Sequence, residues 1–125
     1  MELKENIIRK FIKAYNSFDI DLMMSLLHPD VQFRNFSKDE VTVSAAGKEE
    51  FEKLAIASAR LFSQREQTIT SYIEEDYKVI VKIKYHAVLA VDLPDQFKAG
   101  DNLDIEGTSE YMFKDGLIVS IVDKS

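Results

Sequence analysis

The chain has 125 residues, of which 46% are hydrophobic, and this length is enough for one domain with a single apolar core. Sixteen basic and twenty-two acidic residues give a net charge of −6, which opposes binding to the phosphate backbone of nucleic acid. The absence of cysteine excludes a disulfide framework, a thiolate metal site and a cysteine nucleophile. We therefore expect one domain over residues 1–125, with no metal, no cofactor and no nucleic-acid partner.

The first ten residues, MELKENIIRK, mix charged with apolar side chains and lack the continuous apolar run of a signal peptide. No later segment has the length and hydropathy that a membrane-spanning helix requires. The sequence therefore predicts a cytoplasmic protein without a membrane partner.

Two helices are predicted at the start of the chain. Apolar residues from Ile7 to Tyr15 recur at three- and four-residue steps, which is typical of the buried face of a helix from about Leu3 to Ser17. Asp19 is well placed to cap a second, shorter helix. Pro29 then turns the chain, because proline disfavours helical geometry in the residue before it.

Most of the remaining chain alternates with the two-residue period of strands. Residues 31–36 predict a first strand that presents Phe33 and Asn35 on one face. Residues 37–44 are polar and poorly patterned, so we expect a loop there, and Gly47 introduces a third helix. Four strands follow, and the longest, from Tyr77 to Val91, has apolar residues at every odd position. This order favours a helical lid over a curved sheet, with a pocket between them.

Several local signatures follow the order seen in the nuclear transport factor 2-like superfamily, and the chain resembles its SnoaL-like branch. They are the run F-x-x-A-Y-N-x-x-D-x-D from Phe11 to Asp21, the turn H-P-D-V-x-F from His28 to Phe33, Gly47-Lys48-Glu49, and the spacing of Gly107, Tyr111, Phe113, Gly116 and Ile118. The resemblance implies an α+β, cone-shaped fold in which three N-terminal helices pack on a curved, mostly antiparallel sheet that encloses a pocket. It also implies that a homodimer forms.

The resemblance argues against the best-known chemistry of this superfamily. Ketosteroid isomerases use a tyrosine, an aspartate base and a protonated aspartate, and the aligned residues here are Phe11, Asn35 and Ser109. All three functional groups are missing, so isomerisation by that mechanism is not expected.

Limonene epoxide hydrolases of the same superfamily match this chain in part. Their first-strand asparagine aligns with Asn35 and their last-strand aspartate with Asp123, but Phe33 replaces their tyrosine. Their middle-strand arginine and aspartate must face the pocket, whereas alternation here turns Lys84 and His86 to the opposite face. Epoxide opening is therefore not expected, and we interpret His86 as an exposed or interface residue.

Asp123 and Asn35 are the candidate catalytic residues. Asp123 is either a general base whose pKa an apolar wall raises, with its water held by Asn35, or a solvated aspartate near the C-terminus. Asn35 either orients an oxygen of a ligand or caps a nearby backbone group. Candidate ligand-binding residues are aromatic or hydroxyl side chains expected on the pocket face: Phe11, Tyr15, Phe33, Tyr85, Ser109 and Tyr111.

These features predict a pocket that binds a small apolar organic molecule. Two functions stay open: a cofactor-independent lyase, hydrolase or isomerase of the SnoaL-like kind, and a non-catalytic ligand-binding or protein-interaction module that uses the same fold. The outer face of the long strand alternates lysine with small apolar residues, which favours a homodimer that covers this face.

Overall fold

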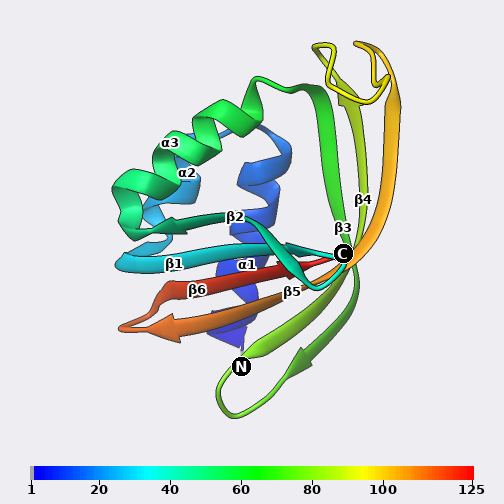
Figure 1. Ribbon diagram of the computed structural model, residues 1–125. Coiled ribbons are helices and arrows are strands. Elements are labelled where there is room, and N and C mark those ends of the chain that lie inside the picture. The colour runs from blue at the N-terminus through cyan, green and yellow to red at the C-terminus, as the bar shows by residue number, and fades with distance from the viewer. Residues whose placement is uncertain (1) are drawn as a thin grey trace.

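The computed structural model describes residues 2–125, and over these residues the fold is α+β with helices on one side of a curved sheet (Figure 1). The helices are α1 (Glu2–Asn16), α2 (Ile20–Ser25) and α3 (Gly47–Ala59). The strands are β1 (Leu27–Ser37), β2 (Glu40–Ala46), β3 (Phe62–Glu74), β4 (Val79–Leu89), β5 (Asn102–Lys114) and β6 (Leu117–Lys124). None of the described helices is long and apolar enough to cross a membrane. The predicted fold class is confirmed.

The six described strands form one sheet in the order β2-β1-β6-β5-β4-β3. Neighbouring strands are antiparallel except for β1 and β6, which run parallel. Figure 1 shows β5 bending along its length, so that β3 and β4 stand at a steep angle to β1, β2 and β6. The bend gives the sheet a concave face, and the core forms where α1 and α3 pack against that face.

The prediction of a loop at residues 37–44 is wrong, because most of this segment belongs to β2, which pairs with β1. Six of the seven residues of β2 are exposed, so no buried face imposes the apolar alternation by which a strand is recognised. The turn between the strands contains Lys38 and Asp39, whose φ angles of 53° and 66° suit a tight hairpin. The β-branched run Val41-Thr42-Val43 was the remaining sequence signal for this strand.

The alternation of the long strand predicts its orientation correctly. Val79, Val81, Ala87 and Leu89 are at most 1% exposed, and Ile83 also lies in the core. The strand is shorter than expected at both ends, because the regular pairing of β4 covers only Val79–Leu89. The odd residues of β4 therefore lie on the concave face of the sheet.

A Schellman motif without glycine ends α1. The amide of Asp19 donates to the carbonyl of Ala14, and the amide of Phe18 donates to the carbonyl of Tyr15. Phe18 takes the left-handed position of the motif with φ of 59°, which glycine adopts more readily than phenylalanine. Asp19 then caps α2 as predicted, since its side chain accepts a hydrogen bond from the amide of Leu22.

The C-terminal end of α1 is fastened to β3, an edge strand of the sheet. The side chain of Asn16 donates to the carbonyl of Gln67 at 3.2 Å and accepts from its amide at 2.8 Å. Nε of Arg65 donates to the carbonyl of Tyr15 at 2.7 Å. These bonds satisfy backbone groups that an edge strand and a helix end leave unpaired, and they fix the side chains of Tyr15 and Arg65 beside the concave face.

Candidate functional site

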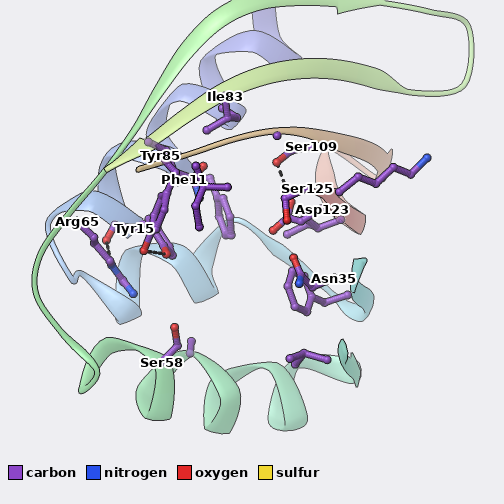
Figure 2. A pocket seen from close by; sticks show the side chains of 18 of the residues that line it. Phe11, Tyr15, Asn35, Ser58, Arg65, Ile83, Tyr85, Ser109, Asp123 and Ser125 are labelled. Atoms are coloured by element: carbon purple, nitrogen blue, oxygen red, sulfur yellow. Dashed lines mark hydrogen bonds between the residues drawn. The ribbon is translucent and has the colours of Figure 1, made fainter. Parts of the chain in front are cut away.

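A cavity of about 460 Å³ lies between the helices and the concave face of the sheet (Figure 2). Its wall includes residues of α1, α3 and the strands β1, β3, β4, β5 and β6. The structure places all eight candidate site residues on this wall: Phe11, Tyr15, Phe33, Asn35, Tyr85, Ser109, Tyr111 and Asp123. The alternation of the strands therefore located the cavity correctly, although it did not show how the polar groups are arranged.

Aromatic rings form the middle of the cavity wall. Phe51 of α3 packs edge to face against Phe33 of β1, with ring centroids 5.7 Å apart, and also packs against Phe11 of α1. The ring of Phe11 in turn meets that of Tyr111 at 6.3 Å. These contacts connect both helices with the sheet around the cavity, and they offer a ligand an apolar surface.

The first polar group of the wall is a row of side chains across three strands. Asn35 of β1 is the register partner of Asp123 of β6, which is also the register partner of Ser109 of β5. The hydroxyl of Ser109 donates to Oδ1 of Asp123 at 2.7 Å. Figure 2 shows Asp123, Ser109 and Asn35 close together at one end of the cavity.

Asp123 is half-buried and lines the cavity, although it lies only two residues from the end of the chain. Burial raises the pKa of its carboxyl group from 3.8 to about 6, while the hydrogen bond from Ser109 opposes this rise. The carboxyl group is therefore mostly ionised at neutral pH and binds a proton readily below pH 6. These are the properties of a general base at neutral pH.

Asn35 makes a contact that neither of the sequence alternatives included. Its Nδ2 donates to the hydroxyl of Thr42 on β2 at 2.9 Å, and the Thr42 hydroxyl donates to the carbonyl of Asn35 at 3.3 Å. The amide therefore links β1 to β2 and caps no backbone group with its side chain. The strand that supplies Thr42 is the one that the sequence failed to indicate.

A second polar group lies at the other end of the cavity and consists of Tyr15, Tyr85 and Arg65 (Figure 2). The hydroxyls of Tyr15 and Tyr85 form a hydrogen bond of 2.9 Å. Burial raises the pKa of both phenols, so both stay protonated and act as hydrogen-bond donors. Arg65 is only 5% exposed, and its guanidinium stacks on the rings of Tyr15 and Phe18.

Arg65 is the site residue that the sequence reasoning missed. It stands among the polar residues Gln64, Glu66 and Gln67, which are typical of a solvated edge strand. Alternation nevertheless places Arg65 on the same side as Gln67 and Ile69, which are half-buried, while Glu66 is exposed. The alternation of β3 was thus the available signal that Arg65 is buried. Charged residues are so rarely buried that such a residue is normally interpreted as solvent-exposed.

His86 lies on the outer face of β4 as predicted, and its Nδ1 is 2.8 Å from Oδ1 of Asp104. Among residues 2–125 no group of three histidine, aspartate or glutamate side chains is arranged to hold a metal ion.

Comparison with known proteins identifies a family. A model described as the SnoaL-like domain matches residues 8–121, which is most of the chain. No curated protein sequence matches the chain.

Solved structures share the fold at low sequence identity. A proposed polyketide cyclase from Xanthomonas campestris pv. campestris superposes with a TM-score of 0.84 at 16% identity, over 99% of this chain and 90% of that chain. An NTF2-like protein of unknown function from Burkholderia pseudomallei gives 0.79 at 14% identity, over 98% and 90%. TerC, co-crystallised with polyporic acid, gives 0.76 at 15% identity, over 97% and 89%. At this identity the likeness shows the fold alone.

The raised pKa of Asp123 predicts a stability that depends on pH. Between pH 3.8 and about 6 the unfolded chain releases this proton while the folded chain keeps it, so the contribution of Asp123 to stability is lost as pH rises. Above pH 6 the folded protein carries the full cost of a half-buried carboxylate. We expect Asp123→Asn to raise the free energy of unfolding at pH 8 by on the order of 1–3 kcal/mol, and by much less at pH 4.

Urea unfolding at both pH values measures this difference. Asp76→Asn makes the same chemical change in the exposed turn between β3 and β4, outside the cavity, and is the matched control. An equal effect of Asp123→Asn at pH 4 and pH 8 would show that the carboxyl group does not titrate in the folded protein as argued.

Proposed function

Because this chain belongs to the SnoaL-like domain family, we propose that it binds a small, mainly apolar organic molecule in the cavity between its helices and its sheet. The observation that carries the proposal is the cavity itself, which has a volume of about 460 Å³ and an aromatic middle with polar groups at each end. Binding sites for small organic molecules have this size and this composition.

The raised pKa of Asp123 supports a chemical role for the same cavity. We propose that its carboxylate removes a proton from a bound ligand or from a water molecule, as the base of a cofactor-independent lyase, hydrolase or isomerase. The bond from Ser109 fixes the orientation of the carboxyl group, and Tyr15 and Asn35 would orient the substrate. Asp123 and Asn35 are thus the proposed catalytic residues, and the six aromatic or hydroxyl side chains of the wall are the proposed ligand contacts.

The printed descriptions of structural neighbours agree with an organic ligand. One neighbour is a proposed polyketide cyclase, and another was co-crystallised with polyporic acid. The identity of the ligand of this chain is a separate question, because these neighbours share at most 16% of its residues.

Binding without chemistry is the second candidate, and the contact of Asn35 favours it. A water molecule poised for attack is held by a second polar group beside the base, whereas the contact of Nδ2 with Thr42 commits one hydrogen and the orientation of the Asn35 amide to linking β1 with β2. If Asn35 keeps that contact when a ligand binds, Asp123 serves to recognise a donor on the ligand instead of activating water.

We also propose that residues 1–125 form one domain, in agreement with the family match over residues 8–121. We further propose that the protein is cytoplasmic, since a chain without cysteine needs no oxidising compartment. Cell fractionation with a tagged protein tests the location. Limited proteolysis tests the domain, because a single domain should resist cleavage inside the matched range.

Blocking the cavity should abolish ligand binding. Ser58 of α3 lines the cavity, so the indole of Ser58→Trp would occupy space that a ligand needs. Ala57→Trp adds the same group on the exposed face of the same helix and is the matched control. A library of small apolar compounds screened by thermal shift should stabilise the wild type and Ala57→Trp but not Ser58→Trp. If compounds stabilise all three proteins equally, they bind outside the cavity.

A proton-transfer test separates chemistry from binding. Compounds that bind and carry a C–H group next to a carbonyl are incubated with the protein in D₂O, and NMR follows the exchange of that hydrogen. If Asp123 is a base, exchange should fall below pH 6, and Asp123→Asn should lower the rate by roughly 10²–10⁴-fold. Tight binding with no exchange above the buffer rate would favour the non-catalytic alternative.

The outer face of the sheet supports the proposal of a homodimer. Met112 is 42% exposed on the outer face of β5, and its neighbours on that face include the half-buried Val122 of β6. Light scattering should give twice the monomer mass, and Met112→Lys should reduce it to the monomer mass. Tyr77→Lys, in the turn between β3 and β4, is the control for loss of an exposed apolar residue. A wild-type protein that remains monomeric at high concentration would contradict the proposal.

A further inference from the structure

We propose that the end of the cavity formed by Arg65, Tyr15 and Tyr85 is an anion subsite, and that the ligand is an apolar molecule that carries a carboxylate group. This inference rests on the proposed function, because it requires a small molecule in the same cavity. Beyond the proposed function, the subsite specifies the charge of the ligand and the orientation of the ligand in the cavity.

Arg65 is a buried cation without a carboxylate partner. Its side chain lines the cavity and is only 5% exposed, yet no described aspartate or glutamate forms an ion pair with it. Its Nη1 is buried and has no hydrogen-bond partner. An unpaired charge and an unsatisfied donor in the same place are costly, and an anionic group of a ligand would remove both costs.

A fixed geometry prepares the guanidinium of Arg65 for such a group. Nε is held by the carbonyl of Tyr15 at 2.7 Å, and the central carbon lies 3.7 Å from the ring centre of Tyr15 and 4.4 Å from that of Phe18. These contacts hold the plane of the group and occupy one of its five N–H donors. A planar fork of donors fits the two oxygens of a carboxylate, which explains why arginine suits this role better than lysine.

The phenol pair supplies one further donor. Because Tyr15 and Tyr85 share a single hydrogen bond between their two hydroxyls, one hydroxyl hydrogen of the pair remains for a ligand oxygen. Burial raises the pKa of both phenols, so this donor persists at neutral and moderately alkaline pH. Donors from Arg65 of β3 and Tyr85 of β4 therefore meet at one end of the cavity.

A purely structural role leaves part of this arrangement unexplained. The hydrogen bond to the Tyr15 carbonyl at the end of α1 uses only Nε of Arg65. That bond does not require a charged group that faces the cavity. Phe18, whose positive φ of 59° ends α1, also lays its ring against the guanidinium, and an aromatic ring does not neutralise the charge. The cluster is thus built around the charge of Arg65 and leaves that charge available.

The other charged groups of the wall set the orientation of the ligand. Asp123 lies at the opposite end and would repel a carboxylate, while Lys124 already pairs with Glu110 at 3.1 Å. The carboxylate of the ligand therefore lies at Arg65, its apolar body lies along Phe11 and Tyr111, and its far end reaches Asp123.

Binding of matched probes tests the subsite. 2-Naphthoate and 2-naphthamide have nearly the same shape and differ in charge, and the chain has no tryptophan to interfere with naphthalene fluorescence. We expect the wild type to bind the naphthoate at least about tenfold more tightly than the amide, as charge-assisted hydrogen bonds do. Arg65→Gln should abolish this preference, and Tyr85→Phe should reduce it.

Lys124→Gln is the matched control, because it removes the other cation of the wall and should keep the preference. Circular dichroism of each variant checks that it folds, and the comparison of probes on the wild type decides the matter even if Arg65→Gln does not fold. Equal binding of the two probes would overturn the anion subsite and leave the proposed function standing. If neither probe binds, both proposals fall.

Discussion

The parallel pairing of β1 with β6 is the constraint on which the rest of this structure depends. It joins the first strand of the chain to the last, and its register sets Asn35 beside Asp123 and Phe33 beside Ile121. A parallel pair needs a long crossover connection, and here the crossover contains α3 and the strands that bend away to form the far wall of the cavity. Without this pairing, β6 would keep only its antiparallel partner β5, and Asn35 would not lie beside Asp123.

The fold separates a buried charge, Arg65, from a half-buried one, Asp123, and places apolar surface between them. Asp123 is held by Ser109 at one end, whereas Arg65 is held at the other by the carbonyl of Tyr15 and by two aromatic rings. Burying either charge costs folding free energy, since neither forms an ion pair with the other. A cavity that keeps these two charges apart is suited to a ligand whose two ends differ in chemical character, one for Arg65 and one for Asp123.

Sequence reasoning reached most of the fold and named residues at both ends of the candidate site. Alternation along β4 placed Tyr85 on the concave face, because one buried face imposes a period of two on the sequence. For Asp123 the sequence left a base in the cavity and a solvated side chain both open. Alternation failed for β2, whose side chains are almost all exposed, and for Arg65, whose polar neighbours hide its burial. Both failures concern edge strands, where packing does not constrain the pattern of side chains.

The sequence by itself determined the helices, the direction of the apolar side chains on the long strand and the family, since these depend on local period and spacing. Only the tertiary structure decided which polar groups meet. The bond of Asn35 to Thr42, the bond of Ser109 to Asp123 and the stacking of Arg65 on Tyr15 join segments distant in the chain or depend on the exact end of a helix. Strand register and burial create these contacts, and with them the raised pKa of Asp123.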